Sequence, residues 1–304
     1  MFPFLSNNTI GGLVLSGSRN KIIKKAYAKI NLYLDIKGRR SDGYHILETL
    51  MVPVSIYDEV EIELKSSSLG ITLESCGEFD CPCDESNTAF KAASIFLRES
   101  KIKTGIGIKI KKNIPSEAGL GGGSSDGASV LTGLNSLFND LFSLDFLEEK
   151  SAEIGADLPF FIRSRPAVCT GIGNIVSPHP GLEKKYLVLI HPLKGIKTAE
   201  VYKKINWGLT NQVKINKRLL FRDCLEVKES LFNDLEIVAE EMLPEIGSVK
   251  TLLKQSGAVI TQMSGSGSTC FGIYCDKPAR DKGFEYILNA YPENWKVYSS
   301  EFVE

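Results

Sequence analysis

A glycine-rich stretch near the middle of the chain joins a strand pattern to a helix pattern. In the sequence PSEAGLGGGSSDGASVL, four of the five residues from Gly119 to Gly123 are glycine, and two serines follow them. Because glycine lacks a Cβ atom, its backbone can approach a ligand closely. Unpaired N–H groups at the start of a helix attract anions. The stretch therefore predicts a phosphate-binding loop, with an amphipathic helix beginning near Ser124.

The two best-known phosphate loops do not fit this sequence. A Walker A loop requires Lys followed by Ser or Thr after its last glycine, and no such pair follows these glycines. The dinucleotide pattern G-x-G-x-x-G also fails, because Gly119 and Gly121 lead to Ser124. Both familiar phosphate loops are therefore excluded, and the alternatives are another class of phosphate loop or a glycine-rich connection tolerated for its flexibility.

The remaining sequence predicts a mixed α+β chain. Alternating apolar residues predict a half-buried strand over 24–36 and further strands over 58–66 and 105–115. Helical spacing follows a start signal at 86–100 and recurs at 145–155. A second region is predicted to begin with a buried strand at 184–192, and it continues with helices near 198–206 and 233–254 and strands near 258–263 and 269–275.

Length and charge limit the class of protein. A chain of 304 residues suggests two domains, at roughly 100–200 residues each, and we place the boundary near residue 180. A net charge of −1 disfavours a general nucleic-acid binder. No apolar run reaches the roughly 18 residues of a membrane span. The seven cysteines are odd in number and irregularly spaced, which indicates reduced thiols, and Cys76, Cys81 and Cys83 lack metal-ligand spacing.

The N-terminal residues 1–25 form an extension without a recognisable motif. They have no basic start and no clear cleavage site, so we do not expect secretion. No acidic residue precedes Asp35, which leaves open a transit segment. We expect a cytoplasmic protein, or one of the plastid stroma if residues 1–25 are such a segment.

Four segments together resemble the GHMP kinase superfamily, named for galacto-, homoserine, mevalonate and phosphomevalonate kinases. The loop from Pro115 resembles its P-x-x-x-G-L-[GA]-[GS]-[GS]-[SA] signature. AYAKINLYLDIKGRRSDGYHILET (26–49), GADLPFF (155–161) and MSGSGSTCFGIY (263–274) resemble motifs of the member family that phosphorylates a cytidylyl alcohol in the non-mevalonate route to isoprenoids. The family usually has Pro where this chain has Tyr27, which changes only the entrance to the strand.

The resemblance implies a fold and a reaction. The fold would be a two-domain α+β GHMP kinase, with an N-terminal domain (26–180) like the second domain of ribosomal protein S5, a ferredoxin-like C-terminal domain (181–304), and the active site in the cleft between them. The reaction would be ATP-dependent phosphorylation of the 2-hydroxyl of 4-diphosphocytidyl-2-C-methyl-D-erythritol, with Mg²⁺ as cofactor. We expect small-molecule partners only, no nucleic acid or membrane, and a monomer or homodimer.

The same resemblance implies the catalytic residues. Asp157 would be the base that accepts the proton of the alcohol, and Lys29 would be the cation beside it. From the residues alone, Asp157 is a helix-terminating residue beside Pro159 and Lys29 is a solvated lysine on a strand. The loop would bind the ATP phosphates through Pro115, Ser116, Glu117, Ala118, Gly119, Leu120, Gly121, Gly122, Gly123, Ser124 and Ser125. An acid near triphosphate would repel it, so the Glu117 side chain should face solvent.

The resemblance also implies the binding residues around this centre. Asn31 shares a strand face with Lys29 and should contact the same substrate. Tyr44 would stack on cytosine and His45 would bond its edge, with Tyr202 as a second aromatic surface and Thr198 nearby. Asn87 and Lys112 would approach adenine, and Ser124 or Ser125 would be the candidate Mg²⁺ ligand. A third glycine motif, Gly265, Ser266 and Gly267, would close over phosphates or substrate.

Several alternatives remain open at this stage. Without the resemblance, DGYH (42–45) is a hairpin connection and Tyr202 a helix-packing residue. The function could be that of another superfamily kinase, of the homoserine or mevalonate type. A nucleotide sensor without catalysis is a second alternative, although it would need neither Lys29 nor Asp157. A nucleic-acid-binding protein on an S5-like fold is a third, which the balanced charge disfavours.

Overall fold

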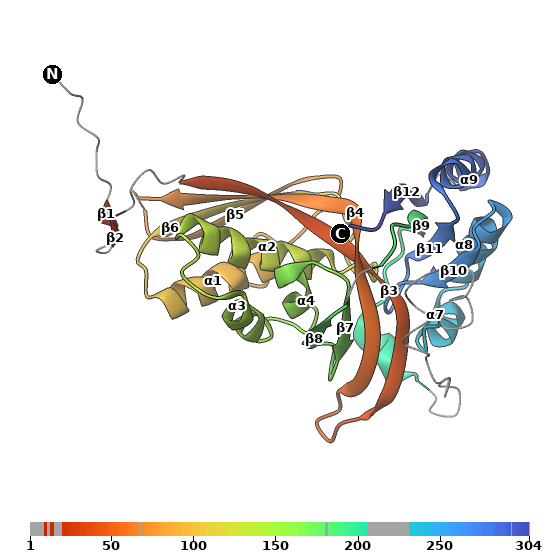
Figure 1. The fold of residues 1–304 in the computed structure, drawn as a ribbon, viewed down its shortest axis with the longest axis horizontal. Coiled ribbons are helices and arrows are strands. Elements are labelled where there is room, and N and C mark those ends of the chain that lie inside the picture. The colour runs from red at the N-terminus through yellow and green to blue at the C-terminus, as the bar shows by residue number, and fades with distance from the viewer. Residues whose placement is uncertain are drawn as a thin grey trace. The chain divides into compact units, whose positions relative to one another are not determined.

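The computed structural model describes residues 9–10, 13–14, 20–66, 68–179, 182–205, 231–292 and 294–303 (Figure 1). Cys224 and the end of the helix predicted at 198–206 lie outside these residues. The chain divides into two compact units, each made of several segments. Unit 1 comprises Met1–Ala26, Asp58–Asn113 and Gly123–Ile162, and unit 2 comprises Tyr27–Tyr57, Ile114–Gly122 and Arg163–Glu304. The division into 26–180 and 181–304 stays a prediction.

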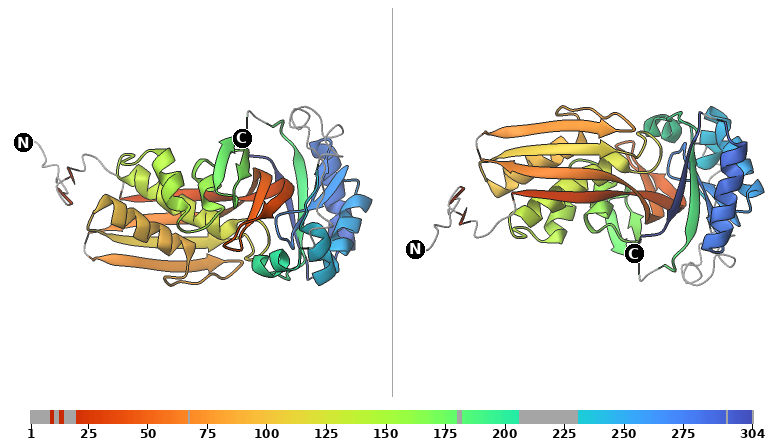
Figure 2. Two further views of the ribbon diagram at one scale, coloured as in Figure 1. Left: turned by 90° about the horizontal axis from the view of Figure 1, so that it is seen from below. Right: turned by 90° about the horizontal axis from the view of Figure 1, so that it is seen from above.

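Unit 1 is a sheet covered by helices on one face (Figure 2). Strand β6 (Gly105–Lys112) runs parallel to β5 (Gly70–Gly77) and antiparallel to the second part of β4 (His45–Lys65). The helices are α1 (Thr88–Ser100), α2 (Gly122–Leu137), α3 (Leu144–Ser151) and α4 (Leu158–Arg163). Two short strands, β1 (Thr9–Ile10) and β2 (Leu13–Val14), pair with each other. The helices predicted at 86–100 and 145–155 and the strand at 105–115 are thus confirmed.

Local sequence explains where two of these helices begin and how they pack. The Asn87 side chain caps α1 by accepting a 2.8 Å hydrogen bond from the Ala89 N–H, the usual role of Asn at this position. Helix α2 begins at Gly122, close to the predicted start, but it is not amphipathic. Residues 125–131 are all buried, and Gly127 lies close to α1: a Cβ there would lie 3.1 Å from the Thr88 carbonyl oxygen.

Unit 2 contains a second sheet with the strand order β10-β11-β9-β12. Its strands are β9 (Tyr186–His191), β10 (Ile260–Met263), β11 (Cys270–Tyr274) and β12 (Lys296–Glu301), and all neighbours are antiparallel. Helices α7 (Glu236–Met242), α8 (Glu245–Gln255) and α9 (Lys277–Ala290) lie on one face of it (Figure 1). Helices follow β9 and β11 in the chain. The strand order and the helical connections together are those of a ferredoxin-like fold.

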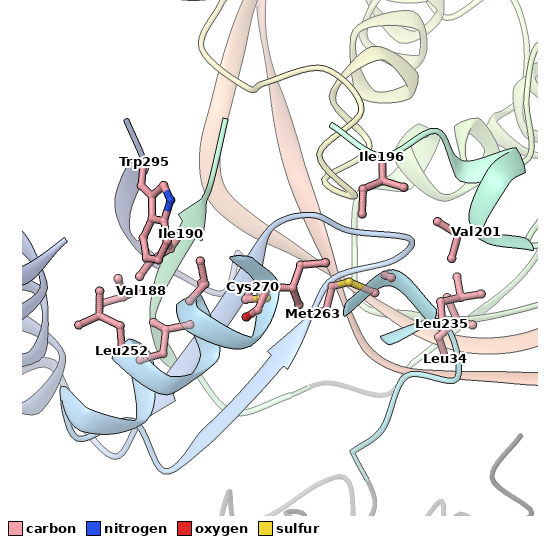
Figure 3. Close-up of a cluster of buried hydrophobic side chains, with 14 of the residues drawn as sticks. Leu34, Val188, Ile190, Ile196, Val201, Leu235, Leu252, Met263, Cys270 and Trp295 are labelled. Atoms are coloured by element: carbon pink, nitrogen blue, oxygen red, sulfur yellow. The ribbon is translucent and has the colours of Figure 1, made fainter. Parts of the chain in front are cut away.

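Alternate residues of β9 fill two cores within unit 2. Val188 and Ile190 join the cluster beneath the helices, which includes Leu252 and Cys270 (Figure 3). Leu187 and Leu189 point the other way, into a cluster with residues of β3 (Lys21–Arg39) and β4. Burial on both faces explains why the segment at 184–192 lacks an alternating pattern, and it confirms the prediction of a buried strand.

Strands β3 and β4 form a long hairpin whose connection is the turn at residues 40–44. The N–H of Arg40 donates a 2.7 Å hydrogen bond to the Tyr44 carbonyl, and Gly43 has a φ of 92°, so the hairpin prediction for DGYH is confirmed. The prediction of a half-buried strand at 24–36 is wrong for residues 28–36, which are all buried. The strand predicted at 58–66 is the last part of the longer strand β4, which begins at His45.

Strand β7 (Ala167–Thr170) pairs with β4 through Thr49–Met51, and β8 (Ile175–Pro178) pairs with β7.

The other predictions for this region are confirmed with one correction. Helix α5 (Thr198–Lys203) and strands β10 and β11 lie where they are predicted. The single helix predicted at 233–254 is two helices, α7 and α8, because Pro244 lacks an N–H group and disfavours helical backbone before it. Within the described residues, no helix is long and apolar enough to cross a membrane.

Candidate functional site

Three motifs meet within unit 2 through backbone hydrogen bonds. The N–H of Lys29 on β3 donates a 2.9 Å bond to the Leu120 carbonyl in the glycine loop. From the third glycine motif, the Thr269 N–H donates a 3.2 Å bond to the Ala118 carbonyl. The Ser264 hydroxyl donates a 2.9 Å bond to the Gly119 carbonyl. The loop segment 118–120 is therefore fixed between the first and third motifs.

Glycine is required where these segments touch. Gly119 has a φ of +75°, and a Cβ there would lie 2.1 Å from the Ser264 carbonyl oxygen. Gly265 has a φ of +56°, and a Cβ there would lie 3.0 Å from the Lys29 ammonium nitrogen. A side chain at either position would be strained and would push the segments apart.

Lys29 and Asn31 form the polar centre of this arrangement. The Lys29 ammonium donates hydrogen bonds to Asn31 Oδ1 at 2.6 Å and to the Gly119 carbonyl at 2.8 Å. Only 3% of Lys29 and 1% of Asn31 is exposed, so the interpretation of Lys29 as a solvated lysine is wrong. A buried ammonium needs hydrogen-bond acceptors to offset its lost hydration, and Asn31 and Gly119 each supply one. The expectation that Lys29 and Asn31 share one strand face is confirmed.

Asn233 supports the third glycine motif and was not predicted from the sequence. Its side-chain amide donates hydrogen bonds to the Gly265 carbonyl at 2.7 Å and the Met263 carbonyl at 3.0 Å. Its Oδ1 accepts a 3.0 Å bond from the N–H of Leu235, just before α7. Asn233 lies three residues before the first residue of α7 and is not its N-cap, so no local capping pattern could indicate that its amide binds a distant turn.

His191 lies beside the same turn at the end of β9. Its Nδ1 is 3.3 Å from the hydroxyl oxygens of both Ser268 and Thr269. Burial lowers the pKa of His191 to about 4, so the imidazole is neutral near pH 7. It is thus a polar support of the turn rather than a cationic group.

Aromatic residues gather at the hairpin end of unit 2. The rings of His45 and Tyr202 are 5.0 Å apart at 32°, a contact that joins the start of β4 to α5. Burial and then the charge of Arg39 lower the pKa of His45. Tyr44 is 61% exposed. Thr198 shares a 2.8 Å hydrogen bond with Ser266 of the third motif. Tyr202 also packs against the helix-side core, so it has both a packing contact and a ring contact.

Gly123, Ser124, Ser125 and Asp157 belong to unit 1. At the helix start Gly123 is exposed, Ser124 is half-buried and Ser125 is only 2% exposed. The Thr88 hydroxyl donates to the Gly123 carbonyl. Asp157 is half-buried and directly precedes α4, with Pro159 as the second helical residue. It therefore stands at a helix start, and the interpretation as a helix-terminating residue is wrong.

Asn87 and Lys112 bind protein groups of unit 1. Besides capping α1, Asn87 donates a 2.6 Å hydrogen bond to the Pro82 carbonyl. The Lys112 ammonium is 2% exposed and binds the carboxylates of Asp58 and Asp126, the latter at 2.8 Å. Burial, reinforced by the Asp58 carboxylate, raises the pKa of Asp126 to about 8 despite the ammonium. The two contacts of the Lys112 ammonium with carboxylates do not favour its approach to adenine. The placement of Lys112 near adenine stays a prediction.

The structure also describes Glu117 and six of the seven cysteines. Glu117 is exposed, as expected for an acid in a phosphate loop. Among the described residues, no disulfide bond joins the cysteines, which are Cys76, Cys81, Cys83, Cys169, Cys270 and Cys275. In the described parts of the chain, no cluster of three or more His, Cys, Asp or Glu side chains could hold a metal ion.

Two family models match this chain, one mainly in its first half and one in its second half. The family model for the GHMP kinases N terminal domain matches residues 87–165, and the model for GHMP kinases C terminal matches residues 216–293. The chain is 40% identical over 278 residues to the 4-diphosphocytidyl-2-C-methyl-D-erythritol kinase of Clostridium perfringens, which covers 88% of this chain and 93% of the relative.

Solved structures agree with this comparison. A crystal structure of 4-(cytidine 5'-diphospho)-2C-methyl-D-erythritol kinase superposes with a TM-score of 0.79 at 30% identity, over 93% of this chain and 100% of that one. Leishmania major mevalonate kinase shares the fold, with a TM-score of 0.71 at 16% identity over 94% of this chain and 98% of that one. The fold predicted from the motifs is confirmed, and the chain belongs to the 4-diphosphocytidyl-2-C-methyl-D-erythritol kinase family of the GHMP kinases.

Proposed function

We propose that this protein transfers the γ-phosphoryl group of ATP to the 2-hydroxyl of 4-diphosphocytidyl-2-C-methyl-D-erythritol. The single observation that carries the proposal is the hydrogen-bonded cluster of Lys29, Asn31, the loop segment 118–120 and the turn at 264–269. A buried ammonium bonded to a phosphate-loop carbonyl suits a reaction in which negative charge develops on a transferring phosphoryl group.

The proposed reaction assigns one role to each catalytic side chain. The substrate hydroxyl oxygen forms a bond to the γ-phosphorus, while the bond from that phosphorus to the β–γ bridging oxygen breaks and ADP leaves. Asp157 accepts the hydroxyl proton, and the Lys29 ammonium stabilises the charge on the reacting oxygens. Asn31 holds Lys29 and faces the same substrate. The products are the 2-phosphate and ADP.

The cytidylyl group is assigned to the aromatic residues of the hairpin end. Tyr44 exposes a ring for stacking, and His45 is held against Tyr202 at a 5.0 Å ring separation. A neutral imidazole can both donate and accept a hydrogen bond, which matches the edge of cytosine. Thr198, bonded to Ser266, would link this subsite to the third glycine motif.

The nucleotide would lie on the loop from Pro115 to Ser125, with its phosphates at the start of α2. Mg²⁺ would neutralise the β- and γ-phosphates. The loop offers the hydroxyls of Ser124 and Ser125 as ligands, which fits an ion held mainly by the nucleotide phosphates. Ser124 is the better protein ligand because Ser125 is only 2% exposed. Asn87 and Lys112 bind protein groups of unit 1, and their approach to the adenine end stays a proposal.

Two further expectations remain proposals. One is a cytoplasmic location, or the plastid stroma if residues 1–25 are a transit segment. The other is a monomer or homodimer that acts only on small molecules.

A coupled ADP-release assay on the purified protein tests the proposal. We would offer the cytidylyl alcohol beside homoserine, mevalonate and phosphomevalonate, each with ATP and Mg²⁺. The expected result is turnover of the cytidylyl compound alone. Turnover of another acceptor without it would reassign the substrate, and ATP binding without any turnover would favour a nucleotide sensor.

A further inference from the structure

Thr49 forms part of the hydrogen-bond chain behind Lys29, although no role in the site has been assigned to it. It lies on β4 with none of its surface exposed. Its hydroxyl donates a 2.6 Å hydrogen bond to the Tyr33 carbonyl and accepts a 2.8 Å bond from the Asn31 side-chain amide. Asn31 in turn accepts from the Lys29 ammonium at 2.6 Å. The chain thus links a strand backbone to the ammonium.

The direction of each bond follows from the chemistry of its groups. A backbone carbonyl only accepts, so the single hydroxyl proton of Thr49 points to Tyr33. The Thr49 oxygen must then accept from Asn31, which requires the NH₂ side of that amide. An ammonium only donates, so the opposite side of the amide, Oδ1, faces Lys29. A rotated Asn31 amide would place NH₂ against the ammonium and a carbonyl against an oxygen lone pair.

We propose that Thr49 is a positioning residue: through the orientation of the Asn31 amide, it fixes the place of the Lys29 ammonium against the glycine loop. This inference rests on the proposed function for the role of Lys29 in turnover. The ammonium also binds the Gly119 carbonyl at 2.8 Å, so a shift of Asn31 would move the cation relative to the phosphate loop. A displaced cation stabilises the transition state less while leaving the ground-state contacts of ATP in place.

Threonine suits this position better than its close analogues. Its β-branch restricts χ1 and is favoured in strands, so the hydroxyl is held in one direction. Thr49→Val keeps the shape and loses the hydroxyl, whereas Thr49→Ser keeps the hydroxyl and loses a methyl group. The two variants therefore separate hydrogen bonding from packing.

The first test measures kcat and KM of both variants in the ADP-release assay. We expect Thr49→Val to lower kcat about tenfold or more, with KM for ATP within about twofold, and Thr49→Ser to stay within about threefold of the parent. Thr104→Val is the matched control, since Thr104 is a buried threonine outside the site whose hydroxyl reaches only a backbone carbonyl. An active, folded Thr49→Val protein with a parental kcat would overturn the proposal.

A double-mutant cycle with Asn31→Ala separates positioning from general destabilisation. If Thr49 acts through Asn31, Thr49→Val should change kcat by less than about twofold in the Asn31→Ala background. If the fold-losses of kcat in Thr49→Val and Asn31→Ala multiply in the double variant, the proposal is contradicted.

A third measurement does not depend on turnover. The Asn31 side-chain NH₂ signal in ¹⁵N-labelled protein, assigned by its loss in Asn31→Ala, should resist hydrogen exchange in the parent and in Thr49→Ser, and lose protection in Thr49→Val. Equal protection in all three would overturn the hydrogen-bond chain. Failure of the parent to phosphorylate the cytidylyl compound would instead count against the proposed function and leave this readout interpretable.

Discussion

Lys112 and Asp126, which flank the glycine loop in the sequence, are joined by a 2.8 Å hydrogen bond buried in unit 1. Lys112 is the last residue of β6, and Asp126 lies in the first turns of α2. Asp58 of β4 accepts from the same ammonium and, at 2.5 Å, from the Asn113 N–H. Three ionisable side chains therefore fix the distance between the two ends of the loop.

Replacing Asp126 by Asn should change how stability depends on pH. Two carboxylates share one ammonium here, and Asp126 Oδ1 has no hydrogen-bond partner within the described residues. Because the pKa of Asp126 is raised to about 8 in the folded state, its stabilising contribution is complete below its unfolded value, near 4, and is lost as pH rises through 8. The free energy of unfolding of Asp126→Asn, relative to the parent, should therefore increase from pH 5 to pH 9.

Urea denaturation at pH 5, 7 and 9 measures this difference. Asp140→Asn, at an exposed position just after the same helix, is the control and should follow the parent. Parallel stability curves for the parent and Asp126→Asn would contradict the prediction.

The sequence predicted elements set by local signals and missed contacts that join distant segments. The cap at Asn87, the loop after β6 and the period of β3 were readable because each depends on neighbouring residues. The pairing of Lys112 with Asp126 could not be predicted from the sequence, because it depends on how the intervening loop folds. Asn233 binds a turn about thirty residues away, and no local pattern encodes that contact. The break at Pro244 was readable from the proline and was missed.

Asp157→Asn should abolish most turnover while ATP still binds. Loss of a general base typically costs about 10²–10⁴ in rate, so we expect kcat to fall at least a hundredfold. Single-turnover ADP release measures the chemical step, and nucleotide titration followed by calorimetry measures binding. Asp140→Asn serves again as the control. Activity within about tenfold of the parent would show that another group accepts the proton.

Tyr202→Ala should weaken binding of the cytidylyl substrate without affecting ATP. Removing the ring leaves His45 without its neighbour at 5.0 Å, and loss of an aromatic surface against a base costs about 1–3 kcal/mol. We expect KM for the acceptor to rise about tenfold, while Tyr202→Phe stays near the parent. Tyr286→Ala on α9, where 45% of the side chain is exposed, is the control. A rise in KM for ATP alone would place Tyr202 outside the acceptor subsite.

Asn233→Ala should destabilise unit 2 and reduce turnover together. The change removes the two donors that hold the Met263 and Gly265 carbonyls and the acceptor for the Leu235 N–H. Unsatisfied buried groups cost about 1–3 kcal/mol each, so we expect a loss of about 3 kcal/mol in urea denaturation. Asn289→Ala, which removes one exposed hydrogen bond to the Glu285 carbonyl, is the matched control. Equal losses in the two variants would mean that Asn233 does not hold the turn.

His191 should make the protein sensitive to acid. Its folded pKa of about 4 lies below the unfolded value near 6.5 because the imidazole is buried. The stability that it contributes is therefore present above pH 6.5 and is lost as pH falls through 4, by up to about 3 kcal/mol. His191→Gln keeps a polar side chain near Ser268 and Thr269 but cannot titrate. The difference in unfolding free energy between the parent and His191→Gln should shrink steadily from pH 7 to pH 4 in urea denaturation. A constant difference over that range would mean that His191 keeps its ordinary pKa in the fold.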